Sequence, residues 1–157
     1  MAGIEALPTS LTLEIVTPDS SLVMERVDKV LIPGSEGYFG VLPGHTPLLA
    51  TLAIGELWYR KGDQRYHLSI AGGFAEVLPD RVTILAEIAE RAEDIDVPRA
   101  ERAKQRAEEI LAKSAETVEV ERAQFSLLKA MVRLQVASLV SSRMGRTNAN
   151  IADGRVP

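Results

Sequence analysis

The distribution of glycine and proline along this 157-residue chain changes sharply near residue 88. Nine of the 11 glycines and six of the eight prolines lie before that point. A long stretch rich in alanine, glutamate and arginine follows, with almost no turn-forming residues until Gly145. Because glycine and proline favour turns and the later composition favours helix, the chain is predicted to change there from strands and turns to helices.

Short segments of strand-forming residues occupy the first part of the chain. Several alternate apolar and polar residues, as Leu11 to Ile15 do, and turn-forming pairs such as Pro43-Gly44 and Gly72-Gly73 separate them. The predicted strands are 11–15, 27–32, 38–42, 56–60, 65–70, 74–78 and 81–84. Many short strands with closely spaced turns predict a sandwich or a barrel, and we interpret this part as a β-sandwich.

Two stripes of apolar residues at helical spacing follow Ile95. Asp96 has the side chain of an N-cap, and Pro98 lies in the first turn, where its missing N–H costs little. The first stripe ends near Leu111, a polar break covers 113–117, and a second stripe follows. Two helices joined by a short link predict an antiparallel helical hairpin.

Alanine dominates the predicted seam between these two helices. Each alanine buries little surface, so at about 25 cal/mol per Å² the hairpin gains only modestly from closing on itself. Isolated helices of this length are also marginally stable. The hairpin is therefore predicted to need another surface or a ligand to fix its position, which makes it a candidate moving part.

Several kinds of chemistry are missing from the sequence. There is no cysteine, and His45 and His67 have no neighbouring ligands at zinc-binding spacing, so no metal site is predicted. No nucleophile elbow, Walker loop or dinucleotide fingerprint occurs, so no catalytic residue is predicted. The net charge of −4, without a basic stripe, argues against nucleic-acid binding. No apolar run reaches the roughly 18 residues of a membrane span, so direct membrane insertion is not expected.

Several segments resemble the epsilon subunit of F-type ATP synthases, called delta in mitochondria. The longest covers residues 33–49 and reads Pro-Gly-Ser-Glu-Gly-Tyr-Phe-Gly-Val-Leu-Pro-Gly-His-Thr-Pro-Leu-Leu. The segments 14–18, 55–57 and 71–77 extend this match across the family's N-terminal sandwich, in the same order and spacing. Residues 90–100 resemble the nucleotide motif at the start of the family's C-terminal hairpin. The resemblance covers about residues 10–140.

The resemblance implies a β-plus-α fold with a ten-stranded β-sandwich over 11–88. An antiparallel two-helix hairpin over 89–142, acting as a regulatory arm, would follow it. A leader over 1–10 and a tail over 143–157 depart from the family. The tail shows no periodicity and is predicted to be disordered.

A family member of this kind is a non-catalytic subunit that contacts the gamma subunit and the membrane-embedded proton-carrying ring. The resemblance therefore implies a peripheral membrane protein on the cytoplasmic or stromal face of the energy-coupling membrane. It also implies that the loop from Glu36 to His45 faces the ring and the stalk base. Because the loop's glycines and prolines are needed for its turns in any case, the contact candidates are Glu36, Tyr38 and His45.

In bacterial members of the family, the motif Ile/Leu-Asp-x-x-Arg-Ala carries an ATP site, and residues 95–100 fit it fully. Carried over by resemblance, adenine and ribose would be held by Glu90, Ile95, Asp96 and Ala100. The phosphates would be met by Arg99, Arg106, Lys129 and Arg133. Each pair of cations shares a helix face by its spacing. Lys129 departs from the family's arginine and lacks its two-pronged grip. No tightly bound cofactor is implied, only ATP as a regulatory ligand.

The resemblance implies that the extended arm stops rotation by meeting acidic surfaces of the catalytic alpha and beta subunits. Three alternatives remain open at this point. The cationic helix faces can be ordinary solvated surfaces, with Glu101 and Glu121 close enough to pair with them. The chain can be a purely structural rotor adaptor whose hairpin is insensitive to nucleotide. A free-standing β-sandwich enzyme or sensor for a small ligand is the alternative from another class.

Overall fold

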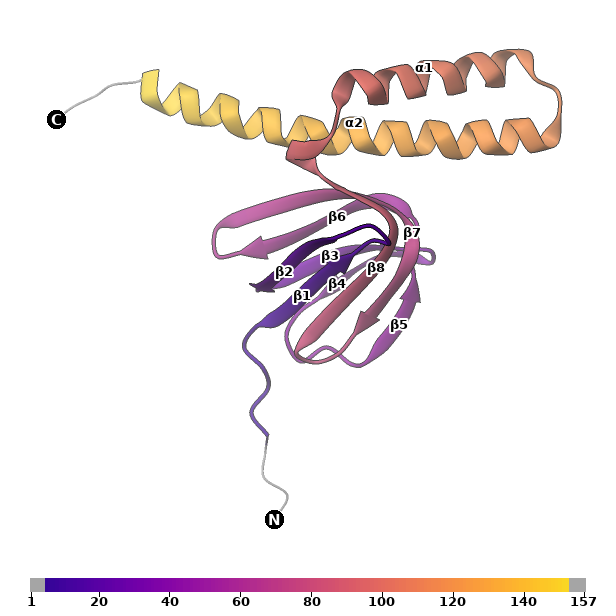
Figure 1. The fold of residues 1–157 in the computed structure, drawn as a ribbon. Helices are drawn as coiled ribbons and strands as arrows, with labels where there is room; N and C mark the ends of the chain where they lie inside the picture. The colour runs from indigo at the N-terminus through magenta and orange to yellow at the C-terminus, as the bar shows by residue number, and fades with distance from the viewer. Residues whose placement is uncertain (1–4, 153–157) are drawn as a thin grey trace. The chain divides into compact units, whose positions relative to one another are not determined.

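Two compact units make up the chain, Met1–Arg91 and Ala92–Pro157. The computed structural model describes the backbone of residues 5–152 and the side chains of residues 5–140 (Figure 1). The first unit extends beyond residue 88, where the sequence predicted the sandwich to end, because the last strand continues to Arg91.

The first unit contains a sheet of eight strands within the described residues. The strands are β1 (Leu11–Val16), β2 (Ser21–Val27), β3 (Lys29–Gly34), β4 (Gly37–Val41), β5 (Leu48–Thr51), β6 (Ile54–Lys61), β7 (Gln64–Val77) and β8 (Arg81–Arg91). Their hydrogen-bonded order is β2-β1-β8-β7-β6-β3-β4, and β5 pairs with β7. All pairs are antiparallel except β1 with β8, which is parallel.

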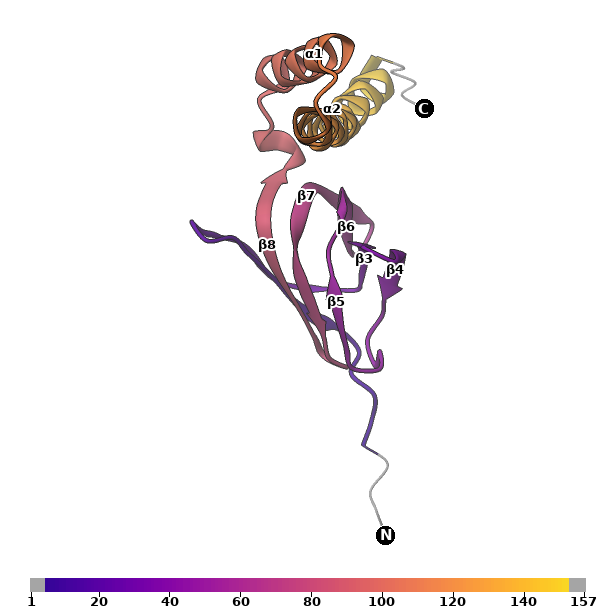
Figure 2. The same cartoon turned by 90° about the vertical axis from the view of Figure 1, so that its right-hand side faces the viewer.

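The sheet is curved (Figure 2), and one of its faces is buried. In β1, for example, Leu11, Leu13 and Ile15 are fully buried, and the residues between them are half-buried. Seven of the eight strands contribute to a single apolar cluster, of which Tyr59 is the largest fully buried member. Since no helix occurs between residues 5 and 91, the sheet must fold over on itself to cover that face, which gives a sandwich.

The predictions of ten strands and of a turn at Gly72-Gly73 are wrong for the described residues. Strand β7 is continuous over 14 residues and passes through both glycines, whose φ angles are 75° and 112°. It pairs with β6 up to Ala71 and with β5 from Phe74 onward. The two glycines therefore form a bend at which one strand changes its neighbour, and two predicted strands become one.

A polar cluster links β2 to the end of β6. Lys61 Nζ lies 2.8 Å from Glu25 Oε2, and the Gly62 N–H donates to Asp28 Oδ2 at 2.7 Å. Arg91 donates to the Leu22 carbonyl oxygen. Beside this cluster, the fully buried Tyr59 stacks on Tyr66 with ring centroids 5.0 Å apart. Burial, with the negative charge of Glu25 adding to it, raises the pKa of Tyr59 from 10.0 to about 12.

This raised pKa predicts an alkaline sensitivity. The folded protein holds the Tyr59 proton up to about pH 12, whereas the unfolded chain releases it near pH 10. Stability is therefore lost as pH rises between these values. We expect Tyr59→Phe to flatten the fall in the free energy of unfolding over this range, measured by urea denaturation at pH 9, 10 and 11. Equal slopes for the variant and the wild type would contradict the burial of this hydroxyl.

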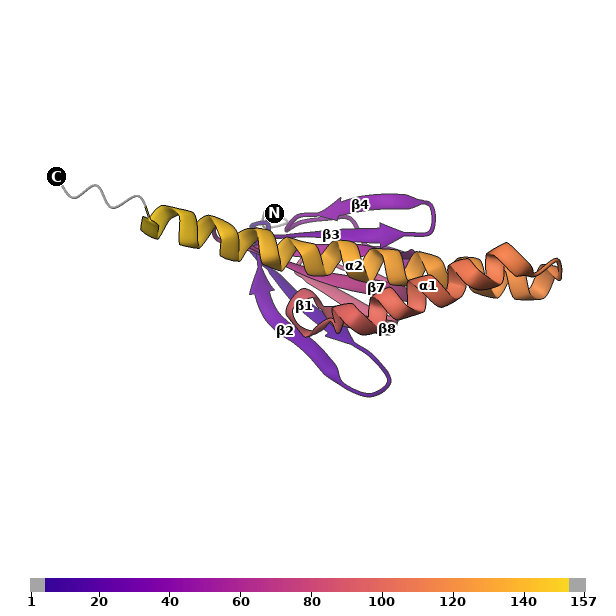
Figure 3. The same ribbon diagram turned by 90° about the horizontal axis from the view of Figure 1, so that it is seen from above.

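The second unit contains η1 (Ala92–Asp94), α1 (Val97–Lys113) and α2 (Thr117–Ala152). Asp96 caps α1 as predicted, because its carboxylate accepts from the Arg99 N–H at 3.0 Å. At the short link before α2, the Ser114 hydroxyl donates to Glu119 Oε2 at 2.6 Å. The chain reverses there, so that α1 and α2 lie side by side (Figures 1 and 3).

The backbone of α2 remains helical through Ala152, although the sequence predicted a disordered tail from residue 143. The physical reason is that residues 143–152 contain no proline and a single glycine, Gly145, so nothing in them blocks continuation of a helix. Residues 153–157 of the predicted tail and 1–4 of the predicted leader lie outside the described residues.

Alanine forms the seam between the helices, as the sequence predicted. Ala100, Ala107, Ala123 and Ala130 are between 0 and 2% exposed. Ala107 and Ala123 lie equally far in the sequence from Ala115, as do Ala100 and Ala130, which places each pair at one level of the hairpin. A small separate cluster forms where α2 meets η1, and its buried residues are Ala92, Ile95, Val136 and Ala137.

Candidate functional site

Three of the predicted nucleotide-binding residues also stabilise the second unit. Ile95 is 8% exposed and belongs to the cluster between η1 and α2. Ala100 is fully buried in the alanine seam, and Asp96 uses its carboxylate as the N-cap of α1. Glu90 lies on β8, in the first unit. Ile95 and Ala100 can therefore shape a site chiefly through the backbone around them, whereas Asp96 keeps an exposed carboxylate.

The four predicted phosphate-binding cations do not all lie at one level of the hairpin. If Ala100 is level with Ala130, Arg99 falls between Lys129 and Arg133, within one turn of each. Arg106 lies about 10 Å further along the helix axis, at a rise of 1.5 Å per residue. Arg99 and Arg106 are exposed, and Lys129 and Arg133 are half-buried. Three of the four cations thus share one end of the hairpin, and Arg106 is nearer the link.

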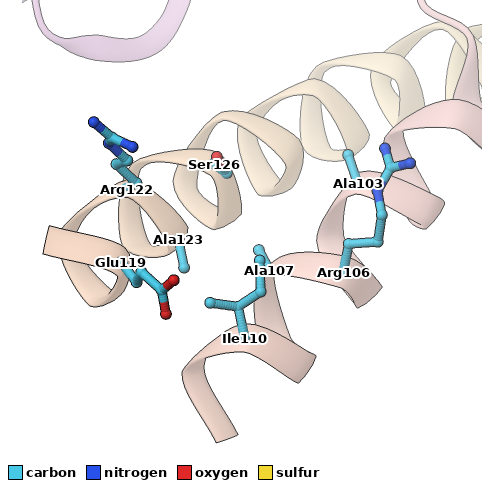
Figure 4. Close-up of a pocket in the computed structure, with 8 residues that line it drawn as sticks. All are labelled: Ala103, Arg106, Ala107, Ile110, Glu119, Arg122, Ala123 and Ser126. Carbon is cyan, nitrogen blue, oxygen red and sulfur yellow. The ribbon is translucent and has the colours of Figure 1, made fainter. Parts of the chain in front are cut away.

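A groove of about 380 Å³ lies between α1 and α2 on the link side (Figure 4). It is lined by Ala103, Arg106, Ala107, Ile110, Glu119, Arg122, Ala123 and Ser126. Four of these eight residues are alanine or serine, whose short side chains leave space between the helices, and none of the eight is aromatic. Arg106 is the one predicted nucleotide-binding residue that lines it. The sequence did not predict the groove because the residues that line it come from two helices.

The predicted contact loop surrounds β4. Glu36 is exposed in the turn before this strand, and Tyr38, on the strand, is 58% exposed. The hydroxyl of Tyr38 accepts the N–H of Glu56 at 3.1 Å. His45 follows β4 and is half-buried, and its Nδ1 donates to the Thr46 carbonyl oxygen at 2.6 Å. Tyr38 and Glu36 therefore present accessible surface, and His45 is tied to the loop backbone.

Three leucines in or next to this loop are exposed, and none of them was predicted from the sequence as a contact residue. Leu42, Leu48 and Leu49 are 53, 40 and 72% exposed. In the sequence, Pro47-Leu48-Leu49 is indistinguishable from the start of a core strand, so only the burial values identify it as surface. Exposed leucines are typical of a protein contact surface when they gather in one patch, and Leu48 and Leu49 are adjacent on β5.

Metal and membrane signatures are missing from the described part of the chain. No group of three or more histidine or acidic side chains among those residues could hold a metal ion. No described helix is long and apolar enough to cross a membrane.

Two family profiles match successive parts of the chain. The beta-sandwich domain of the ATP synthase delta/epsilon chain matches residues 10–92, and its long alpha-helix domain matches residues 93–138. The chain belongs to the ATP synthase delta/epsilon family. It is therefore a non-catalytic subunit of an ATP synthase, and the alternative of a free-standing enzyme is excluded.

Curated relatives agree with this assignment over most of the delta/epsilon-type chain. The ATP synthase epsilon chain of Nitratidesulfovibrio vulgaris is 54% identical over 127 residues, which is 81% of this chain and 95% of that one. The epsilon chain of Solibacter usitatus is 45% identical over 131 residues, covering 83% and 98%. Among solved structures, a chain in the mitochondrial ATP synthase of Euglena gracilis (OSCP/F1/c-ring) has a TM-score of 0.75 and 27% identity, covering 88% of this chain and 87% of that one.

Proposed function

We propose that this subunit sits in the rotor of an F-type ATP synthase and couples proton-driven rotation to ATP synthesis. Its partners are the gamma subunit and the membrane-embedded proton-carrying ring, on the cytoplasmic or stromal face of the energy-coupling membrane. The observation that carries this proposal is the continuous match of both family domains across residues 10–138, together with the likeness to a chain of an F1/c-ring assembly. The surface around Glu36, Tyr38 and His45 would make the ring-side contact.

The helical hairpin would be the regulatory part of the subunit. Its alanine seam buries little surface, and the groove between α1 and α2 leaves the link end open. The packing of the two helices on each other therefore stabilises the closed hairpin only modestly, and other contacts can outweigh it. Extended, the basic second helix (Arg122, Lys129 and Arg133) would meet the catalytic alpha and beta subunits and stop ATP hydrolysis.

ATP would favour the folded hairpin by binding to it alone, near the end of the hairpin where Arg99, Lys129 and Arg133 share a level. Cations from both helices would have to converge on one triphosphate. ATP would therefore bind only when the two helices lie together, and its binding would increase the population of the closed state. A hundredfold excess of ATP over Kd would stabilise the closed state by about 2.7 kcal/mol. Glu90, Ile95, Asp96 and Ala100 would hold the nucleoside, and Arg106, nearer the link, would have to reach further.

Calorimetric titration of the purified chain with ATP tests the sensing role. We expect binding with Arg102→Gln, a control on an exposed arginine outside the predicted set, and loss of binding with Arg133→Gln. The same pair should separate in melting temperature when ATP is added. If wild-type chain gives no heat at millimolar ATP, the hairpin is insensitive to nucleotide and the subunit is a structural rotor adaptor.

A further inference from the structure

Tyr38 is an exposed aromatic residue whose position is fixed by groups on another strand. We propose that Gly55 and Glu56 on β6 are positioning residues for Tyr38. The space beside Gly55 and the N–H of Glu56 hold the phenol group of Tyr38 in one orientation for partner contact. The inference deepens the proposed function, since it rests on the surface around Tyr38 that was proposed above to contact the proton-carrying ring. It is carried by three observations: a break in the sheet ladder, a close approach at Gly55, and the exposure of the ring.

The break in the ladder explains why Glu56 needs a partner. Strand β3 pairs with β6 only from Lys29 to Leu31, where Leu31 is opposite Trp58. Further along, the Pro33 carbonyl oxygen accepts the Ala53 N–H at 2.9 Å instead. The Glu56 N–H therefore has no ladder partner on β3, and the Tyr38 hydroxyl accepts it at 3.1 Å.

The close approach at Gly55 explains why this position has no side chain. A Cβ atom there would lie 2.5 Å from the Tyr38 hydroxyl oxygen and 2.8 Å from Pro33 Cβ. Both distances are shorter than real Cβ contacts allow, so any larger residue would displace the phenol end of Tyr38. Gly55 is buried in β6 and does not have a left-handed φ, so space and not backbone conformation sets the requirement.

Glu56 is itself fixed to the next strand. His67 on β7 donates from Nδ1 to Glu56 Oε1 at 2.5 Å, and both side chains are only 20% exposed. The residue whose N–H holds Tyr38 thus lies in a strand and not in a loop, and its side chain is bonded to the neighbouring strand.

Tyr38 nevertheless keeps 58% of its surface exposed. An aromatic ring that is both open to solvent and already oriented is suited to interface binding. Fixing such a side chain in advance avoids the entropic cost of ordering it on association. Tyrosine is also among the residues that most often dominate interfaces.

The test measures rebinding of the full chain to ATP synthase membranes stripped of this subunit. We expect Tyr38→Ala to weaken binding at least tenfold. Tyr38→Phe, which keeps the ring but loses the hydroxyl, should weaken it several-fold with little change in melting temperature, because water can replace the hydroxyl at this exposed bond. Gly55→Ala should weaken binding to a similar extent, because its Cβ would displace the phenol end of Tyr38.

A double variant separates positioning from general structural damage. If Gly55 acts through Tyr38, Gly55→Ala will weaken binding in the wild type but will have no further effect in the Tyr38→Ala background. An equal effect in both backgrounds, or wild-type binding by Tyr38→Phe, would overturn the positioning role. If Tyr38→Ala instead binds as tightly as the wild type, Tyr38 is not part of the surface that contacts the proton-carrying ring.

Discussion

Gly73→Ala is expected to lower the free energy of unfolding of the sandwich by more than about 4 kcal/mol, or to prevent folding. A Cβ atom at Gly73 would lie 2.0 Å from the Leu85 carbonyl oxygen and 2.9 Å from Ala86 Cα. Those atoms belong to the backbone of β8, which cannot move without breaking its pairing with β7. The φ of 112° adds a conformational penalty for any L side chain.

Gly37→Ala is the matched control for this prediction. Gly37 has a φ of 124°, but a Cβ there would meet nothing within 4 Å. It therefore isolates the backbone penalty, which we expect to be about 1–2 kcal/mol. Urea denaturation of both variants gives the comparison. If the two variants lose the same stability, the close packing of β7 on β8 at the bend is not what requires Gly73.

Ala130→Leu is expected to open the helical hairpin while leaving the sandwich folded. Ala130 is 2% exposed, lies level with Ala100 in the seam, and does not line the groove. Three added carbons have no space to enter, and overpacking of this kind costs about 1–3 kcal/mol. Because the seam itself stabilises the hairpin only slightly, this cost is not offset by other packing between the helices. Amide-exchange protection in α1 should therefore fall about 5- to 150-fold.

In the assembled complex, the same substitution should strengthen inhibition of ATP hydrolysis, since it releases the arm. Ala112→Leu is the control, because Ala112 is exposed on α1. Unchanged exchange in α1 with Ala130→Leu would mean that the seam tolerates a larger side chain and that the helices are held together by other contacts.

The parts of the fold set by local chemistry could be predicted from the sequence. The Asp96 cap is local, since the carboxylate and the Arg99 N–H that it accepts are three residues apart. The alanine seam follows from helical spacing in the same way. The conformation of Gly72-Gly73 could not be predicted, because two adjacent glycines fit a turn between strands and a bend within one strand equally well. The choice depends on β5 and β6 pairing with the same strand, which is a long-range property.

The candidate site was predictable to the same extent. Spacing placed Arg99 and Arg106 on one helix face, but only the seam shows that Arg106 lies nearer the link than Lys129 and Arg133. Tyr38 was predicted as a contact residue from its loop. Its dependence on Gly55 could not be seen, since the two residues meet only through the folded sheet.

We propose that contacts outside the hairpin decide its position, because the alanine seam holds the two helices together only weakly. Amide hydrogen exchange of the full chain, with and without millimolar ATP, tests this most directly. We expect residues 97–140 to exchange much faster than the central strands β7 and β8 without ATP, and to become protected when ATP is added. Protection equal to that of these strands in both conditions would contradict it.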